Sequence, residues 1–286
     1  MNRITETRAL NSTVTLMKVE APDVAKRAKA GQFIILRVDD KGERIPLTVA
    51  DTDPATGEVT IMFQVAGATT RLLSMMKAGD FLADFVGPLG QPTHYEGAKK
   101  VCVVGGGVGC AIAYPQAKTL HKMGIPVDVV AGFKSKDIVI LEDEFTAACD
   151  NLYITTDDGT YGIPGFVTTQ LEKLINEGKG YDLVIAIGPI PMMKFVSAVT
   201  KKYGIKTIVS LNSLMVDGTG MCGACRVSVG GETRFTCVDG PEFDGHQVDF
   251  DEAMRRQGMY KTLEQRAAKI EEERAAGHKC RIGLDK

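Results

Sequence analysis

The chain has 286 residues, of which 44% are hydrophobic and 24% charged, and its formal net charge is −2. The length suits two domains with a substantial core, and the balanced charge gives no reason to expect binding to nucleic acid. No apolar run approaches the roughly 18 residues of a membrane span, and the first residues lack the apolar core of a signal peptide. We therefore expect a cytoplasmic protein that binds neither nucleic acid nor membranes.

Residues 1–97 show the pattern of an all-β domain. Short runs with alternating apolar residues, such as 33–38 and 59–65, are separated by turn-forming clusters such as 51–57. Many short strands at this spacing are typical of a small barrel or sandwich.

The pattern changes at Val101, where apolar segments, of which 101–104 is fully apolar, begin to alternate with helix-forming stretches. The apolar segments are 101–104, 127–131, 152–156, 183–187 and 207–209. Strands that are apolar on both faces indicate a parallel sheet covered by helices, so we expect an α/β domain over 98–210. Residues 211–248 are rich in glycine and cysteine and need support from the rest of the chain. Residues 249–286 are charged and predicted to be helical.

The strongest chemical signal is the segment 217–225, which Cys237 follows. Plant-type 2Fe–2S proteins space their ligands C-x4-C-x2-C…C. Cys222, Cys225 and Cys237 occupy the last three positions of this pattern, and Asp217 stands at the first. Small residues between the ligands let backbone N–H groups approach the cluster sulfurs, and a carboxylate oxygen can bind ferric iron. The motif therefore predicts a 2Fe–2S cluster.

Two alternatives to this ligand set stay open. Zinc could take the three cysteines and a fourth ligand, or Asp217 could be only the first residue of an Asp-Gly turn, with a ligand from elsewhere. If Asp217 is a ligand, replacing it by cysteine should keep the cluster and shift its reduction potential.

Two glycine-containing turns follow apolar strands of the α/β region. The first consists of Gly105, Gly106, Gly107, Val108 and Gly109. Between a strand and a helix, backbone amides and the helix N-terminus can receive a pyrophosphate, although a plain strand–helix turn is the alternative. The second turn contains Gly188, Pro189 and Met192. Two such turns at the carboxyl ends of strands mark one ligand-binding crevice of an open sheet.

A weaker signal lies in the β region. Its members are Arg44, Ile45, Pro46, Leu47 and Thr48, then segments 67–70 and 87–90. An arginine, a hydroxyl and small residues could bind the pyrophosphate and ring edge of a flavin. Ordinary barrel turns and a surface arginine are the alternative.

Together these segments resemble the ferredoxin reductase superfamily, and more closely the electron-transfer subunits of dihydroorotate dehydrogenase. The likeness covers about residues 5–245. It rests on segments 46–48, 105–109, 156–162, 188–192 and 237–241. It implies an FAD-binding antiparallel β-barrel over 1–97, an NAD(P)-binding Rossmann-like domain over 98–210 and a 2Fe–2S lobe over 211–248.

The resemblance also implies positions for the cofactors. The flavin should be lined by Ile45, Pro46, Leu47, Thr48, Met62, Phe63 and Gln64, with its phosphates near Thr69 and Thr70. The nicotinamide cofactor should lie near Gly105–Gly109, Asp157, Asp158, Gly188, Pro189 and Met192. One departure concerns the arginine that the family places two residues before the flavin-stacking position, where this chain has Ile45 and carries Arg44 one place earlier.

Asp217 and the segment 243–252 resemble one branch, the small subunits of NADH-dependent ferredoxin:NADP oxidoreductases, also described as sulfide dehydrogenase β subunits. The branch implies hydride transfer between NAD(H) and FAD and single-electron relay through the cluster. The partner is a larger, glutamate-synthase-like subunit with FAD and 4Fe–4S clusters, and ferredoxin is reached only indirectly. Hydride transfer needs no acid–base residue, so no catalytic side chain is expected. The alternatives are a dihydroorotate dehydrogenase electron-transfer subunit, a sulfide dehydrogenase, and a non-enzymatic module stabilised by zinc.

Two further features leave alternatives open. Lys134, Ser135 and Lys136 could hold the 2′-phosphate of NADP, and the acidic segment 142–144 would disfavour it, so the choice of NAD(H) follows from the resemblance. In the tail, apolar residues recur at helical spacing. They are Tyr260, Leu263, Ala267 and Ile270. This stripe packs either on its own domain or on a partner.

Overall fold

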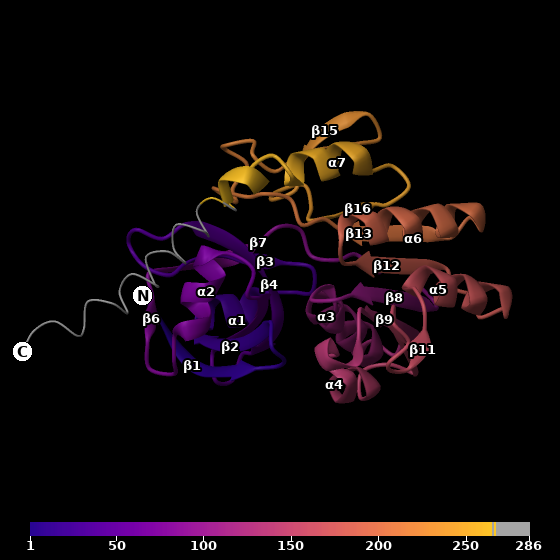
Figure 1. Ribbon diagram of the computed structural model, residues 1–286, viewed down its shortest axis with the longest axis horizontal. Helices are drawn as coiled ribbons and strands as arrows, with labels where there is room; N and C mark the ends of the chain where they lie inside the picture. Colours follow the sequence, from indigo (N-terminus) through magenta and orange to yellow (C-terminus); the bar gives the residue numbers. More distant parts are fainter. Residues whose placement is uncertain (265, 267–286) are drawn as a thin grey trace, which may run out of the picture.

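The computed structural model describes residues 1–264 and 266. Its N-terminal part is an antiparallel sheet with strand order β6-β1-β2-β5-β4-β3-β7, curled into a partly open barrel (Figure 1). The strands are β1 Asn2–Ala9, β2 Val14–Glu20, β3 Phe33–Arg37, β4 Arg44–Asp53, β5 Glu58–Gln64, β6 Phe81–Leu82 and β7 Asp84–Leu89. Two short helices, α1 Pro22–Arg27 and α2 Ala68–Met75, place Val24 and Leu73 in the barrel core. The expected antiparallel barrel is confirmed.

Strand β3 serves two cores, which explains its unbroken apolar sequence. Successive side chains of a strand point to opposite faces. Ile34 and Leu36 lie in the barrel core, whereas Phe33 and Ile35 pack with Met215 and other residues of the cysteine-rich segment. The barrel therefore provides the support that this segment was expected to need.

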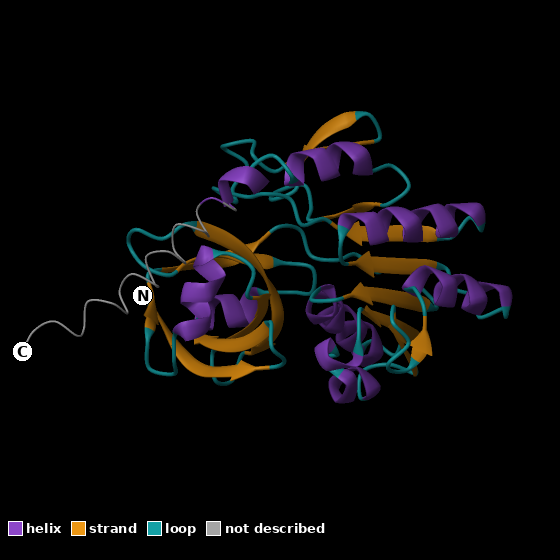
Figure 2. Ribbon diagram, in the orientation of Figure 1, coloured by secondary structure: helices purple, strands orange, loops and turns teal. Residues whose placement is uncertain are grey.

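The second sheet has the order β11-β10-β9-β8-β12-β13-β16, and its strands are parallel except for the last pair (Figure 2). The strands are β8 Val101–Gly106, β9 Val127–Phe133, β10 Asn151–Thr156, β11 Ile163–Pro164, β12 Leu183–Ile187, β13 Lys206–Ser210 and β16 Glu242–Asp244. The helices are α3 Gly109–Lys122, α4 Glu142–Thr146, α5 Val167–Asn176 and α6 Ile190–Lys202, with a 3-10 turn at Lys136–Ile138. The expected helix-covered parallel sheet is confirmed.

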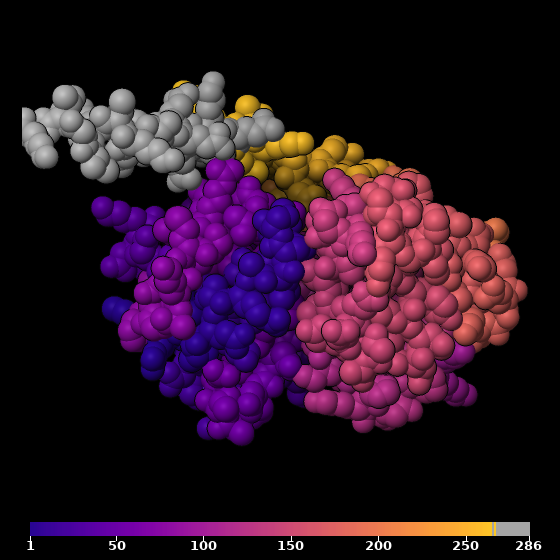
Figure 3. All heavy atoms as spheres, turned by 60° about the horizontal axis from the view of Figure 1, so that its bottom comes forward, coloured from indigo at the N-terminus to yellow at the C-terminus, as the bar shows by residue number. Residues whose placement is uncertain are grey.

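Both faces of this sheet are buried, so its central strands are apolar on both faces apart from the buried Asp128 of β9. In β8, Val101 and Val103 lie in a core that also contains residues of α3 and of barrel strands β2, β4 and β5. Cys102 and Val104 point to the opposite face, where α5 and α6 pack. Helix α3 therefore lies between the sheet and the barrel, and the two parts are pressed together (Figure 3).

The cysteine-rich segment contains a hairpin of β14 Arg226–Val229 and β15 Glu232–Phe235, and helix α7 Phe250–Gln257 follows it. Strand β16 leaves this segment and pairs antiparallel with β13, so the expected lobe also completes the edge of the α/β sheet. Tyr260 and Leu263 of the predicted tail stripe are exposed, and Ala267 and Ile270 lie outside the described residues. In the part of the chain that the structure describes, no helix is long and apolar enough to cross a membrane.

Candidate functional site

The two glycine turns meet at one point of the α/β sheet. Strands β8 and β12 are neighbours, with Gly105 opposite Ile187, and the chain runs from them towards opposite edges of the sheet. A Cβ on Gly109 would lie 2.5 Å from the carbonyl oxygen of Ile187, and one on Gly106 would lie 2.4 Å from Sδ of Met192. At Gly109 only glycine fits this approach, because a backbone carbonyl cannot move aside as the flexible Met192 side chain can. The structure thus brings the predicted turns together at a topological switch point, where open α/β sheets bind ligands.

Asp157 and Asp158 lie at the carboxyl end of β10 and are exposed. The amide of Asp157 donates to the carbonyl oxygen of Phe133 at 3.0 Å, which joins this turn to the end of β9. The hydroxyl and amide of Thr160 donate to Oδ1 of Asp158 at 2.7 and 3.0 Å, and these bonds lower the pKa of that carboxyl. The carboxyl end of β10 therefore presents the acidic groups of Asp157 and Asp158 beside the loop that carries Lys134.

The acidic segment that follows β9 is already engaged in part. Both carboxylate oxygens of Glu142 accept a hydrogen bond from the Tyr161 hydroxyl, at 2.8 and 3.0 Å. This bond is the main reason why the pKa of Tyr161 is raised. Nζ of Lys136 lies over the same ring, 5.3 Å from its centre. Glu142 and Lys136, two of the charged residues predicted to influence the choice between NAD and NADP, therefore both contact Tyr161.

The residues predicted to line the flavin lie on two strands of the barrel, β4 and β5. Ile45, Pro46, Leu47 and Thr48 are on β4, and their side chains are half-buried. On β5, Met62 lies in the core shared with α3, Phe63 lies in the barrel core, and Gln64 is exposed. Neither buried side chain of β5 faces an open surface.

Thr69 and Thr70 stand at the start of α2. The Thr70 hydroxyl accepts hydrogen bonds from the amides of Ala66 and Gly67, both at 3.0 Å, and so caps the helix. The Thr69 hydroxyl donates to Glu43 at 3.3 Å. The Thr70 hydroxyl bonds amides that precede the helix, and the amides of the first helical turn remain suited to an anion.

The predicted flavin strand and the cysteine loop are in contact. Nη2 of Arg44 donates to the carbonyl oxygen of Asp217 at 3.5 Å. A Cβ on Gly218 would lie 2.7 Å from Cγ1 of Ile35, so the loop is pressed against β3. Two segments that are about 170 residues apart by sequence thus form one neighbourhood.

The three cysteines of the motif differ in exposure. Cys225 and Cys237 are buried, and their Sγ atoms lie 3.3 Å apart. Burial raises the pKa of Cys237 to about 12, and the neighbouring Cys225 adds to this. Cys222 is exposed, and backbone N–H groups of Ala224 and Asp217 lower its pKa. Amides directed at a sulfur, and paired thiols, suit an iron–sulfur cluster.

Asp217 folds its own loop. Its Oδ2 accepts hydrogen bonds from the amide and hydroxyl of Thr219, at 3.0 and 2.5 Å, and from the amide of Met221 at 3.3 Å. The Thr219 hydroxyl is the main cause of the lowered pKa of this carboxyl. All three bonds use one carboxylate oxygen, so the turn and the ligand interpretations of Asp217 are compatible.

Among the described residues, no three His, Cys, Asp or Glu side chains lie close enough to share a single metal ion. A two-iron cluster takes its four ligands in two pairs. Cys225 and Cys237 form one pair, and Asp217 and Cys222 lie together as the other. The donors present fit a 2Fe–2S cluster in this arrangement.

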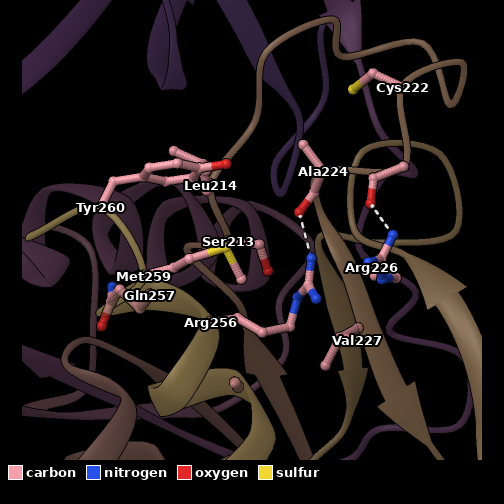
Figure 4. A pocket seen from close by; sticks show the side chains of 12 residues that line it. Ser213, Leu214, Cys222, Ala224, Arg226, Val227, Arg256, Gln257, Met259 and Tyr260 are labelled. Carbon is pink, nitrogen blue, oxygen red and sulfur yellow. Dashed lines mark hydrogen bonds between the residues drawn. The ribbon is translucent and has the colours of Figure 1, made fainter.

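Two arginines beside the loop were missed by sequence reasoning. Arg226 on β14 and Arg256 on α7 line a pocket of about 260 Å³ together with Cys222 (Figure 4). Each guanidinium group donates to a loop carbonyl, that of Gly223 or Ala224. Only the packing of α7 brings Arg256 there, so no local spacing could have found it.

Comparisons with known proteins decide the family. The iron–sulfur cluster binding domain of dihydroorotate dehydrogenase B matches residues 212–249. The dihydroorotate dehydrogenase B (NAD(+)) electron transfer subunit homolog of Thermotoga maritima is 47% identical over 265 residues, which cover 90% of this chain and 93% of that one. The electron transfer subunit of Streptococcus thermophilus is 37% identical and covers 76% of this chain and 86% of that one. The chain belongs to the dihydroorotate dehydrogenase B electron-transfer subunit family.

Two further relatives refine the comparison. A protein encoded in the adh 3′ region of Clostridium beijerinckii is 54% identical, with 97% of each chain covered. A solved structure of the NADH-dependent reduced ferredoxin-NADP oxidoreductase superposes with a TM-score of 0.89 at 44% identity, covering 94% of this chain and 97% of that one. A ferredoxin NADP⁺ reductase of Neisseria gonorrhoeae, 16% identical with a TM-score of 0.58, shares the fold.

These comparisons confirm the expected superfamily and the nature of the chain as an oxidoreductase electron-transfer subunit with an iron–sulfur domain. They also separate the open alternatives for the metal. The matched family over 212–249 binds an iron–sulfur cluster, so the zinc-stabilised, non-enzymatic module loses its support. The roles of the individual site residues remain predictions.

Proposed function

We propose that the chain is the NAD(H)-reacting subunit of an electron-bifurcating, NADH-dependent ferredoxin:NADP oxidoreductase. The observation that carries this proposal is the similarity to the solved structure of such an enzyme, with a TM-score of 0.89 over 94% of the chain. The proposed division is 1–97 for FAD, 98–210 for NAD(H), 211–248 for the 2Fe–2S cluster and 249–286 for the tail.

The nicotinamide cofactor is proposed to bind at the switch point between β8 and β12. The N-terminus of α3, a helix of 14 residues, follows the glycine turn at the carboxyl end of β8 and is proposed to receive its pyrophosphate. The close packing of Gly109 on Ile187 keeps this turn tight against the sheet. Asp157 and Asp158 at the end of β10 are proposed to meet the ribose, and acidic groups there favour NAD over NADP.

The flavin is proposed to lie along β4 of the barrel, with its phosphates near Arg44 and the start of α2. When bound, a flavin accepts a hydride as an electron pair and releases electrons singly, which suits it to a place between nicotinamide and cluster. The chain contributes placement: α3 presses the α/β sheet onto the barrel, and Arg44 joins β4 to the cysteine loop.

The exit for electrons is proposed to lie at Cys222. Cys225 and Cys237 are each 2% exposed, whereas Cys222 is exposed and the neighbouring Val216 and Met221 are 54% and 86% exposed. Exposed apolar side chains that gather at one place mark a contact surface. The proposed partner is a larger, glutamate-synthase-like subunit with FAD and 4Fe–4S clusters, through which ferredoxin is reached. A cytoplasmic location belongs to the proposal, because thiolate ligands persist in a reducing compartment.

A visible absorption spectrum tests the cofactors. The purified chain should show flavin bands with a broad iron–sulfur shoulder, and anaerobic NADH should bleach both. Cys225→Ser should lose the shoulder and keep the flavin bands, while Cys149→Ser, which removes a buried thiol outside the motif, should keep both. A colourless wild-type chain that contains zinc would overturn the proposal, and faster bleaching by NADPH than by NADH would overturn the choice of NAD(H).

The Asp217→Cys variant tests the fourth ligand. Exchanging an oxygen ligand for a thiolate changes the charge and covalency at one iron, so the variant should keep a cluster whose reduction potential differs from wild type. Thr219→Val serves as the control, because it removes a hydrogen bond to Asp217 without adding a ligand. An unchanged spectrum and potential in Asp217→Cys contradict ligation by Asp217.

A further inference from the structure

The pocket beside the cysteine loop contains two ordered contacts from arginine (Figure 4). Nη2 of Arg256 on α7 donates to the carbonyl oxygen of Ala224 at 3.1 Å, and Nη1 of Arg226 on β14 donates to that of Gly223 at 3.4 Å. Both carbonyl groups lie inside the C-x2-C part of the motif. Two neighbouring peptide groups of the loop thus each meet a guanidinium group.

We infer that Arg256, assisted by Arg226, raises the reduction potential of the cluster by binding these two carbonyl groups. The inference rests on the proposed function, because it requires a cluster at the cysteine loop. It assigns to both arginines a positioning and electrostatic role that lies outside the cysteine motif.

The peptide geometry provides the first part of the argument. The carbonyl of Gly223 and the N–H of Ala224 belong to one peptide group, which lies in the cysteine loop between Cys222 and Cys225. A positive charge at the carbonyl end polarises the group and strengthens its N–H as a donor. Arg256 acts in the same way on the peptide that contains the N–H of Cys225. Hydrogen bonds to cluster sulfurs are a known means of setting the potential.

Charge provides the second part. Reduction adds one electron to the cluster, so a nearby positive charge stabilises the reduced form. Arginine keeps its charge at every relevant pH. Arg256 is half-buried, whereas Arg226 is exposed and therefore more strongly screened by salt and water. We expect Arg256 to contribute the larger effect.

Helix α7 fixes the position of Arg256. Asp249 caps the helix by accepting from the amide of Glu252 at 2.8 Å, and Oε2 of Glu252 accepts from the amide of Ser228 on β14 at 3.1 Å. Nζ of Lys194 on α6 also binds Asp251 at 2.7 Å. The helix begins at Phe250, directly after the matched iron–sulfur domain of residues 212–249. A segment beyond that domain thus reaches back to its metal-binding loop.

The test is a potentiometric titration of the cluster, followed by electron paramagnetic resonance, in the flavin-loaded chain. Arg256→Gln should lower the equilibrium constant for one-electron reduction by roughly tenfold, which corresponds to about 59 mV. Arg255→Gln is the matched control, since it makes the same change of charge at the adjacent, exposed position and should leave the potential unchanged. Arg256→Lys keeps the positive charge and should show a potential close to that of wild type. Arg226→Gln should lower the potential by less than Arg256→Gln does.

The outcomes separate this inference from the proposed function. A wild-type chain without a cluster overturns both. A wild-type chain with a cluster whose potential is the same in Arg256→Gln, or shifts equally in Arg255→Gln, overturns the inference alone. If Arg256→Gln loses its cluster, the other two arginine variants decide. A lowered potential in Arg226→Gln together with a near-wild-type potential in Arg256→Lys supports the inference. Any other pair of results overturns it.

Discussion

Glu242 lies where three parts of the chain meet, and its replacement gives a quantitative test of the structure. Its Oε1 accepts hydrogen bonds from Nε2 of Gln116 at 2.7 Å and from the hydroxyl of Thr93 at 2.9 Å. Gln116 is buried in α3, Thr93 lies in the segment that links the barrel to the α/β sheet, and Glu242 itself is on β16. The Tyr95 hydroxyl completes the cluster by donating to Oε1 of Gln116.

Burial raises the pKa of Glu242 from 4.5 to about 7, against the opposing effect of its two hydrogen bonds. Because the folded chain then holds this proton more tightly than the unfolded chain, stability falls as the pH rises from 4.5 to about 7 and stays lower above it. At about 1.4 kcal/mol per pKa unit, the loss is about 3 kcal/mol. Glu242→Gln keeps an acceptor oxygen for Gln116 and Thr93 and removes the charge.

We expect Glu242→Gln to match the wild type below about pH 5 and to be about 3 kcal/mol more stable at about pH 9. Urea unfolding followed by circular dichroism measures this difference at each pH, since the chain has no tryptophan for fluorescence. Glu20→Gln, at the exposed end of β2, is the control and should show the same pH dependence as the wild type.

Two results would refute the reasoning about Glu242. If wild type and Glu242→Gln lose stability in parallel between about pH 5 and pH 9, the carboxyl is ionised normally in the folded chain. If the variant is less stable at every pH, the carboxylate contributes more through its hydrogen bonds than it costs through burial.

Two further predictions concern the α/β sheet. Gly109→Ala should lower the free energy of unfolding by about 1–3 kcal/mol through overpacking, because its Cβ would lie 2.5 Å from the carbonyl oxygen of Ile187. The variant should also bind NADH more weakly in a fluorescence titration. Unchanged stability would contradict the contact between the two glycine turns. Tyr181→Phe should lower the free energy of unfolding in urea by about 1.5–3 kcal/mol, because it removes a hydrogen bond to a charged group. That bond joins the Tyr181 hydroxyl to the buried carboxylate of Asp128 at 2.6 Å. Tyr203→Phe, at a half-buried position, should lower the free energy of unfolding by less. Equal losses in the two variants would mean that the burial of Asp128 does not strengthen its bond to Tyr181.

The chain order of strands and helices follows from local pattern. Each apolar segment predicted in the α/β region became a parallel strand, because a strand that is buried on both faces is predominantly apolar on both. The strand predicted at 152–156 is β10, Asn151–Thr156, and the one at 207–209 is β13, Lys206–Ser210. In the barrel, the runs 33–38 and 59–65 correspond to β3 and β5 within a residue or two at each end.

The chemistry of the site could be predicted where it depends on spacing. The intervals between Asp217, Cys222 and Cys225 belong to a single loop, and a loop's ligand geometry is local. The glycines at 105–109 could be found for the same reason, since a strand–turn–helix junction is a continuous segment. The meeting of this turn with Gly188 could be anticipated because parallel strands end at the same edge of a sheet.

The sequence by itself thus determined the β-barrel, the helix-covered sheet, the cysteine loop and the family resemblance, all of which are recorded in short-range patterns. Only the tertiary structure decided that β16 joins the α/β sheet, that Glu242 meets Thr93 and Gln116, and that Arg256 reaches the carbonyl of Ala224. The physical reason is that these contacts depend on how separate elements pack. Packing is set by the shape and burial of many side chains together, and no spacing along the chain encodes it.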